Sequence, residues 1–359
     1  MRRVTMGAKD CLIASTADYF ELRRAVAAAG LLERRVWLYA PHFLGVALAA
    51  ASAIAVFALL EGPWLFLAAP FLSLFWIQLG FIGHEAGHNQ VSARTSVNRA
   101  IGLTVFPFLL GMGFRPWVIQ HNQHHAEPNV IGGDPDIDNE LLAFTEDAAR
   151  EARGVRRWIV RRQAALYPLL GLFATISQRK VGWYYVLGIG PKLANGPRYD
   201  HERRVELVLL AVGTAGWIVL PSLILGAGTW LPVYAVAQLM LGGHMATVFA
   251  PNHKGLEQFE ADRAPTFLEL QVRTSRNVAP GWLCDFFHGG LNYQIEHHLF
   301  PTMPRSHLGA ARLIVRDFCA ARGLTYEEDS FVGSWRIIFA ELDRLGRLTE
   351  PPASQSQLA

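Results

Sequence analysis

The sequence contains little charge and few cysteines. Only 18% of its 359 residues are charged, whereas 51% are hydrophobic, and the mean hydropathy is +0.20. These values argue against an ordinary soluble enzyme and are typical of a membrane protein with a substantial aqueous part. The net charge is only +3, and we expect no nucleic-acid partner.

Two further features are missing. The three cysteines, Cys11, Cys284 and Cys319, lie far apart without C-x-x-C spacing, so we interpret them as reduced cytoplasmic thiols rather than a disulfide framework. The first 40 residues are basic and mixed-polar, without the apolar stretch of a secretory signal. We therefore expect no cleavable leader.

Long uncharged runs are present instead. Residues 43–60 and 64–83 flank a short Glu-Gly-Pro break, and residues 207–243 are uncharged throughout but interrupted by Gly226 and Gly228. A helix needs about 20 apolar residues to cross the hydrocarbon core. The sequence predicts an all-α integral membrane protein with four transmembrane helices in two hairpins, at about 43–60, 64–83, 207–226 and 229–250. The shorter apolar stretches 100–114 and 164–178 predict interfacial helices.

Arginine placement predicts the orientation. The hairpin tips at 61–63 and 226–229 contain no Arg or Lys, whereas residues 1–40 and 150–162 are rich in Arg. The positive-inside rule places both termini and the 84–204 segment in the cytoplasm. We favour binding of lipid headgroups over protein docking for the 150–162 stretch. The predicted organisation is a cytoplasmic N-terminal segment (1–40), a membrane domain (41–350) and a disordered tail (351–359).

Three histidine motifs indicate metal chemistry. G-H-E-A-G-H places two histidines four residues apart, Q-H-N-Q-H-H places three at i, i+3 and i+4, and Q-I-E-H-H-L-F-P repeats that spacing with Gln first. On a helix these positions share one face. The first motif alone is weak because chance often supplies it, whereas the second is specific. The residues concerned are His84, His88, His121, His124, His125, His297, His298 and, as a weaker candidate, Gln294.

The predicted topology supports these motifs independently. All three fall on the cytoplasmic side of the predicted spans, as does His253 just after the fourth span. Eight imidazoles exceed the four ligands of a single structural zinc, so two ions are implied, and imidazole suits Fe, Zn, Cu or Ni. A metal pair beside apolar helices suits oxidation of a lipid chain, because O₂ with non-haem iron can attack an unactivated C–H bond.

The set H-E-A-G-H, H-N-Q-H-H and G-G-L-N-Y-Q-I-E-H-H-L-F-P resembles the membrane fatty acid desaturases, over roughly residues 40–325. The Gln-led third motif is similar to that of the front-end acyl desaturases. The resemblance implies two iron ions held by the histidines named above, with O₂ as co-substrate and an acyl-CoA or acyl-lipid substrate within the membrane lipids. No H-P-G-G haem motif of a fused cytochrome b5 occurs. We therefore expect a separate electron donor, such as a ferredoxin, a cytochrome b5 or a flavoprotein reductase.

Other residues carry weaker predictions. Asp134, Asp136 and Asn252 are candidates for hydrogen bonding to ligand side chains, although turn chemistry explains the aspartates equally well. His244 lies within the fourth span and is interpreted as a helix-packing residue. Three alternatives stay open: a hydroxylase or ketolase on the same scaffold, a non-catalytic membrane metal-binding protein, and a zinc-dependent lipid hydrolase, which would leave several histidines unexplained.

Overall fold

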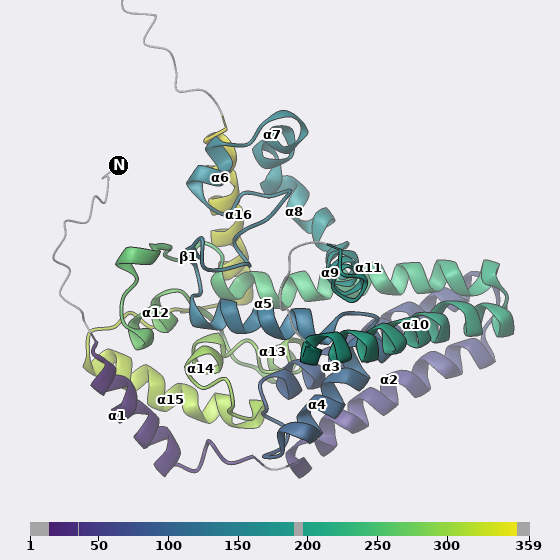
Figure 1. Cartoon of the computed structure of the whole chain (residues 1–359), viewed down its shortest axis with the longest axis horizontal. Coiled ribbons are helices and arrows are strands. Elements are labelled where there is room, and N and C mark those ends of the chain that lie inside the picture. The colour runs from purple at the N-terminus through teal and green to yellow at the C-terminus, as the bar shows by residue number, and fades with distance from the viewer. Residues whose placement is uncertain (1–13, 35, 190–196, 350–359) are drawn as a thin grey trace, which may run out of the picture.

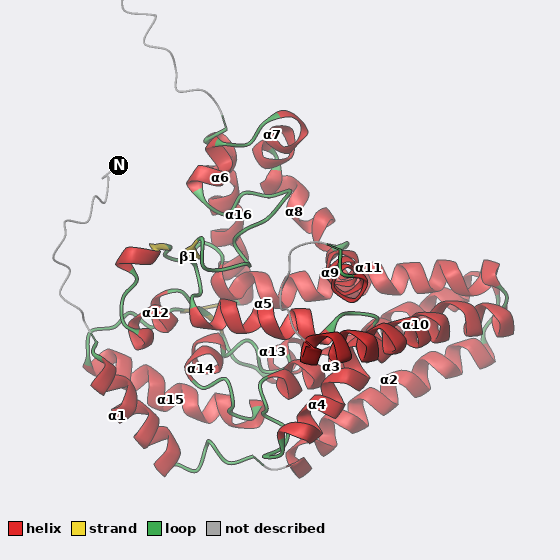
Figure 2. Cartoon of the chain, viewed as in Figure 1, coloured by secondary structure: helices red, strands yellow, loops and turns green. Residues whose placement is uncertain are grey.

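The computed structural model describes residues 14–34, 36–189 and 197–349. The regular secondary structure of these residues is almost entirely helical, and loops connect the helices (Figure 2). The only strands among them are four two-residue segments: β1 (Val130–Ile131), β2 (Phe259–Glu260), β3 (Asn277–Val278) and β4 (Glu328–Asp329). Four long helices extend together to one side, and shorter helices gather at their opposite ends (Figure 1). The predicted all-α class is therefore confirmed.

The four long helices are the predicted membrane spans. Their apolar segments cover Ala40–Leu59 in α2, Gly62–Gly87 in the 3₁₀ segment η2 (Gly62–Leu67) and α3 (Ala68–Gly87), Asp200–Leu225 in α10 (Pro197–Leu225), and Ala227–His253 in α11. Each is long and apolar enough to cross a bilayer. The predicted boundaries differ from these by at most seven residues, since polar residues extend both α10 and α11 beyond the uncharged runs.

The two hairpins turn at glycines. Gly62 has φ +58° and Gly226 has φ +83°, a backbone region that glycine adopts without steric cost. In each hairpin the second helix is the inner one. Of the most apolar stretch of each span, 56% is buried in the span that ends in α3 and 39% in α11. The buried share is only 17% in α2 and 11% in α10. Because α3 and α11 both run away from the hairpin tips, their C-terminal ends meet on the same side (Figure 1).

The predicted interfacial stretch 100–114 folds as a sharply bent segment. Helix α4 (Thr95–Leu103) continues into the π-helix η3 (Thr104–Leu110), and the chain then turns by 113° into α5 (Phe114–Ala126). Gly111, with φ +70°, forms the turn. Glu206 of α10 fixes the start of α5, since its carboxylate accepts hydrogen bonds from the backbone N–H groups of Phe114 and Arg115 at 2.9 and 2.8 Å.

The second predicted interfacial stretch, 164–178, spans two helices. It comprises most of α8 (Gln163–Gly171) and the start of α9 (Ala174–Leu187), because the helix is interrupted at residues 172–173. The remaining helical elements surround the ends of the spans, and these are η1 (Val36–Tyr39), α1 (Thr16–Ala28), α6 (Glu146–Arg150), α7 (Gly154–Arg161), α8 (Gln163–Gly171), α9 (Ala174–Leu187), η4 (Ala261–Arg263), α12 (Phe267–Arg273), α13 (Trp282–His288), α14 (Gln294–Leu299), α15 (Arg305–Ala321) and α16 (Phe331–Arg347).

The N-terminal helix is part of the core. Leu22 and Val26 of α1 are fully buried in an apolar cluster shared with α12, α14 and α15. Burial of such side chains contributes about 1.5–3 kcal/mol each. The division at residue 40 stays a prediction, and the predicted tail 351–359 and Cys11 lie outside the described residues.

Candidate metal centre

The first histidine motif closes helix α3. His84 lies in its last turn and His88 is its C-cap, so the two side chains share one face. Gly87 between them has a steric reason to be glycine, because a Cβ at this position would lie 2.4 Å from the ring of Trp117. The missing side chain lets Trp117 of α5 pack directly against the end of α3, with its ring centroid 5.4 Å from that of His84.

The second motif lies in the last two turns of α5. His121, His124 and His125 point toward the ends of α3 and α11. Two short contacts join α5 to those helices: the Nε2 atoms of His84 and His121 are 3.0 Å apart, and those of His124 and His253 are 3.2 Å apart. The helix α5 therefore contributes imidazoles in two directions.

The third motif forms the short helix α14, which other segments hold in place. The backbone N–H of Ile295 donates to Asn277 Oδ1 at 2.9 Å, and Asn277 Nδ2 donates to Glu296 Oε2 at 2.8 Å. Strand β3, which contains Asn277, pairs in parallel with β4. His297 and His298, on adjacent positions of α14, consequently face different neighbours.

The structure brings the predicted histidines together in two groups. In each, the nitrogen atoms available for coordination lie within 4.8 Å of one another. The first histidine group is His84, His88, His121 and His297. The second histidine group is His124, His253 and His298.

His125 lies between the two groups. Its Nε2 is 3.2 Å from His121 Nε2, and its ring stacks on that of His298 with centroids 4.1 Å apart. His88 is also adjacent, at 4.5 Å between ring centroids. All eight predicted histidines thus belong to one continuous imidazole array.

Each imidazole of the second histidine group has a partner on its outer nitrogen. His124 Nδ1 is 2.9 Å from Asp134 Oδ1, His253 Nδ1 is 2.9 Å from the Thr274 carbonyl oxygen, and His298 Nδ1 is 2.8 Å from Gln271 Oε1. An acceptor at Nδ1 fixes the proton on that atom and leaves the Nε2 lone pair free, which is the usual arrangement in metal-bound histidines.

This arrangement makes the inner contacts informative. When Nδ1 of both His124 and His253 carries the proton, two Nε2 lone pairs face each other at 3.2 Å, and two acceptors cannot share a hydrogen bond without a proton or another cation between them. In addition, buried Nε2 atoms of His88, His297 and His298 have no hydrogen-bond partner among the described residues. Buried polar atoms are normally paired. These unpaired nitrogen atoms are therefore suited to bind a metal ion.

Gln294 lies beside the second group, with Nε2 2.9 Å from His253 Nε2. Its Oε1 accepts a hydrogen bond from Asn252 Nδ2 at 2.9 Å, so this orientation presents the amide nitrogen to the site. Asn252 Oδ1 is buried and has no partner among the described residues. If both amide groups are rotated by about 180°, Gln294 Nε2 donates a hydrogen bond to Asn252 Oδ1, and Gln294 Oε1 faces the site. The rotation is sterically possible because the oxygen and nitrogen of an amide have nearly the same shape.

Burial favours neutral imidazoles. It lowers the pKa of His297 and His298 well below the usual value, and neighbouring imidazoles lower it further. For His124, burial also acts to lower the pKa, but the carboxylates of Asp136 and Asp134 outweigh it and raise the pKa. Asp136 is the more distant of the two, at 3.7 Å from His124 Nδ1, and its side chain is 61% exposed.

The two glutamates of the motifs face away from the histidines. Glu85 forms a buried ion pair with Arg305 of α15, at 2.6 and 2.8 Å, and accepts a hydrogen bond from the Tyr39 hydroxyl at 3.3 Å. Glu296 accepts from Tyr326 at 2.8 Å as well as from Asn277. Burial raises the pKa of Glu296 to about 7. Both residues fix the helices that carry the histidines.

Sequence reasoning missed Gln271. Its Oε1 accepts from His298, and its Nε2 donates to the His125 carbonyl oxygen at 3.0 Å, so it connects two motifs. It lies on α12, more than 20 residues before the third motif, and no spacing rule relates it to a histidine. Its fully buried position is a property of the folded chain alone.

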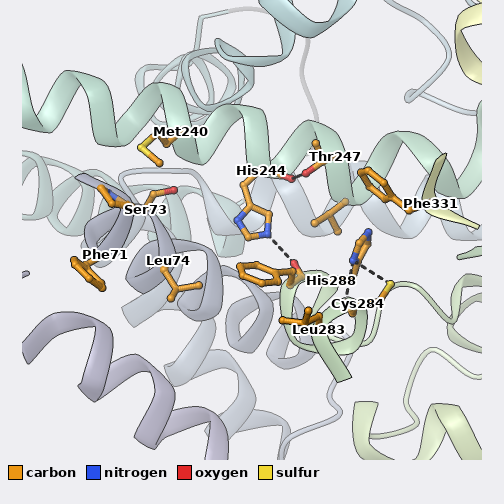
Figure 3. Close-up of a pocket in the computed structure, with 13 residues that line it drawn as sticks. Phe71, Ser73, Leu74, Met240, His244, Thr247, Leu283, Cys284, His288 and Phe331 are labelled. Carbon is orange, nitrogen blue, oxygen red and sulfur yellow. Dashed lines mark hydrogen bonds between the residues drawn. The ribbon is translucent and has the colours of Figure 1, made fainter. Parts of the chain in front are cut away.

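The structure contains a cavity of about 690 Å³, and Figure 3 shows residues that line it. It is bounded by α3, α11, α13 and the start of α16, and its lining includes His244, His288 and Phe71. His244 Nε2 is 2.7 Å from the Phe287 carbonyl oxygen, joining α11 to α13. That contact agrees with the helix-packing role predicted for it.

Comparison with known proteins gives a consistent result. The family profile described as "Fatty acid desaturase" matches residues 61–330. A Delta(5) fatty acid desaturase of Caenorhabditis elegans is 31% identical, over 89% of this chain and 71% of the relative. A Delta(6)-fatty-acid desaturase of the same organism is 30% identical (81% and 67% covered), and a Delta(8)-fatty-acid desaturase of Euglena gracilis is 29% identical (86% and 74%).

Proposed function

Because this chain belongs to the fatty acid desaturase family, and is therefore an oxidoreductase acting on fatty acyl chains, we propose that it desaturates an acyl chain with O₂ at a non-haem diiron centre. Two hydrogen atoms of adjacent methylenes, two protons and two electrons from a reductant would reduce O₂ to two water molecules and leave a double bond. The observation that carries this proposal is the convergence of seven imidazoles into two adjoining groups, with an eighth, that of His125, between them.

We assign the ligands by group. His84, His88, His121 and His297 would hold one ion, and His124, His253 and His298 the other. His125 would contribute between them, and Gln294 would be a weaker ligand through its amide oxygen. Imidazole suits iron, and bound iron would supply the activation of O₂ that an unactivated C–H bond requires. The set is larger than one ion needs.

Other residues of the chain would prepare the site. Asp134, Gln271 and the Thr274 carbonyl group hold the Nδ1–H of their imidazoles, so each ring keeps its orientation and presents a lone pair inward. Asn252 would orient the amide of Gln294. Burial of the array keeps competing water away from the reacting carbon.

We further propose that the metal centre faces the cytoplasm. His84 and His88 of α3 and His253 of α11 lie at the helix ends opposite the hairpin tips, and those tips contain no Arg or Lys. Reducing equivalents would then come from a separate cytoplasmic or membrane-bound donor, namely a ferredoxin, a cytochrome b5 or a flavoprotein reductase. The substrate would be an acyl lipid or an acyl-CoA.

The test is a mass-spectrometric lipid profile of a host that expresses the wild type or His297→Ala, together with iron analysis of both purified proteins. We expect a new unsaturated acyl chain only with the wild type, and less iron in the variant. His201→Ala is the matched control, because His201 is exposed and far from the motifs in sequence. A new hydroxylated lipid would instead establish an oxygenase on the same scaffold. A wild-type protein that binds no iron would overturn the proposal.

A further inference from the structure

Helix α7 exposes apolar side chains on one of its faces. Val155 is 77% exposed and Trp158 is 53% exposed, and a spacing of three residues places them on the same side of the helix. On the opposite side, Val160 is completely buried in an apolar cluster that includes Leu345 of α16. Single apolar residues on a surface are normal, so the charged groups around these two decide what the face can bind.

The charged groups around α7 are mostly arginines without a carboxylate partner. Residues 150–162 contain six arginines and only one acidic residue. Arg150 forms an ion pair with Glu146 of α6. In contrast, Arg153 and Arg156 donate hydrogen bonds to backbone carbonyl oxygens. A carbonyl group satisfies an N–H donor but does not neutralise the cation, so α7 keeps a net positive charge.

Arg162 joins this charge to the exposed face. Its guanidinium group lies over the Trp158 ring, 4.9 Å from the centroid. Stacking uses the flat face of the guanidinium group, and among the described residues no carboxylate or carbonyl oxygen accepts a hydrogen bond from this side chain. Its N–H groups are therefore available for an anion, and a phosphate can accept two of them at once. Tryptophan rings are enriched where a bilayer meets water.

The packing of α8 places α7 near the membrane surface. A Cβ at Gly242 of α11 would lie only 2.1 Å from the Leu172 carbonyl oxygen, so the turn after α8 lies directly on the backbone of α11. Gly242 is 16 residues beyond Gly226 at the hairpin tip, which is about 24 Å of helix axis. Because the hydrocarbon core is about 30 Å thick, this contact lies near its boundary. Figure 1 shows α7 to the side of the spans, next to α8.

We propose that α7 lies in the headgroup layer of the bilayer and binds an anionic phospholipid. Arg162 binds the phosphate, and the Trp158 ring and Val155 insert among the upper parts of the acyl chains. Arg153 and Arg156 strengthen the preference for a negatively charged surface. A basic helix could also bind an acidic protein, but two exposed apolar side chains near the boundary of the hydrocarbon core favour lipid. The proposal is independent of the catalytic function, since no residue of the histidine groups takes part.

The experiment uses the full chain in nanodiscs of phosphatidylcholine. The discs also contain either phosphatidylglycerol or phosphatidylcholine with a photoactivatable diazirine at the start of one acyl chain, and labelled peptides are identified by mass spectrometry. The proteins are the wild type, Arg162→Gln, Trp158→Ser and Arg24→Gln. Arg24 is the matched control because it is an exposed arginine on α1, away from α7 (Figure 1). Circular dichroism shows whether each variant keeps its helical content.

We expect phosphatidylglycerol to label residues 154–162 at least about fivefold more than phosphatidylcholine, the preference expected from one basic residue near the surface. Arg162→Gln should lower labelling by phosphatidylglycerol about fivefold, and Arg24→Gln by less than about twofold. Trp158→Ser should lower labelling by both lipids to a similar extent, because insertion of the ring does not depend on the charge of the headgroup.

Three results would overturn the proposal: equal labelling of α7 by the two lipids, labelling that Arg162→Gln leaves unchanged, and no labelling of α7 by either lipid. In the last case, hydrogen–deuterium exchange with an added acidic ferredoxin identifies the other class of partner. Protection of residues 154–162 by the ferredoxin would show that α7 binds a protein and not the bilayer.

Discussion

The two histidine groups are built in different ways. In the second group every imidazole has a hydrogen-bond acceptor at Nδ1, supplied by Asp134, Thr274 or Gln271. In the first group no Nδ1 hydrogen bond links an imidazole to another described residue. Its rings are placed by packing, with Trp117 stacked on His121 at 4.6 Å between centroids and 23° between planes.

The difference follows from the elements that carry the ligands. The first group draws three of its four histidines from two helices, the span α3 and the 13-residue α5, whose backbone already fixes their spacing. The second group draws each of its three from a different segment, α5, α11 and α14. Segments that meet only in the folded chain need cross-links, and the hydrogen bonds at Nδ1 provide them.

The largest expected effect is that of removing a proposed ligand from one group at a time. His88→Ala and His253→Ala should each lower activity by more than about 100-fold. This loss is larger than the one expected when only the hydrogen-bond partner of a metal ligand is removed. If the groups bind separate ions, each variant should retain about one iron per chain of the two proposed. Iron analysis with Mössbauer spectroscopy measures this. Loss of both ions in each variant would show that the groups act as one site.

A large effect on stability is expected from the ion pair behind the first group. Arg305→Met leaves the buried carboxylate of Glu85 without its partner, which typically costs about 3–5 kcal/mol. The apparent Tm of the purified protein should fall clearly. In the double variant Glu85→Gln/Arg305→Met the charge is absent, and most of the loss should be recovered. Equal Tm values for the single and double variants would contradict this role.

Asp134→Asn should weaken the second group selectively. The substitution keeps the shape of the side chain but removes the charge that polarises His124, and loss of such a partner typically lowers metal affinity by about 10–100-fold. Competition with an iron chelator should show one ion released more easily and the other unchanged. Asp136→Asn is the comparison and should weaken the ion less, because that carboxylate lies 3.7 Å from His124 Nδ1 and is mostly exposed. Equal effects of both substitutions would contradict a specific role for Asp134.

The sequence predicted the features that a single helix determines. The i, i+3, i+4 spacing placed His121, His124 and His125 on one face, and uncharged length predicted all four spans. It could not predict contacts between distant segments. Glu85 and Arg305 are 220 residues apart in sequence, and each has many alternative partners until the chain folds. Gln271 gave no local signal for the same reason.

Helix α13 was missed for a different reason. Its seven residues, Trp282–His288, are apolar on one side, but a membrane span is recognised from about 20 consecutive apolar residues. A short apolar helix that packs against the spans is recognisable only from its neighbours, here Gln78 and His244 on the spans. The separation of the histidines into two groups also could not be predicted from the sequence. The spacing of residues indicates which side chains share a helix face, but it does not indicate which other segments that face contacts.

The smallest expected effect tests whether packing alone positions the first group. Trp117→Leu removes the stacked ring from His121, and such aromatic contacts contribute about 0.5–1.5 kcal/mol. Iron affinity at the first group should therefore fall only several-fold, while the second group, whose imidazoles keep their hydrogen bonds, should be unaffected. Trp117→Phe retains a ring and should recover part of the loss. If Trp117→Leu weakened both ions equally, stacking would act on α5 as a whole, and the contrast between a packed group and a hydrogen-bonded group would fail.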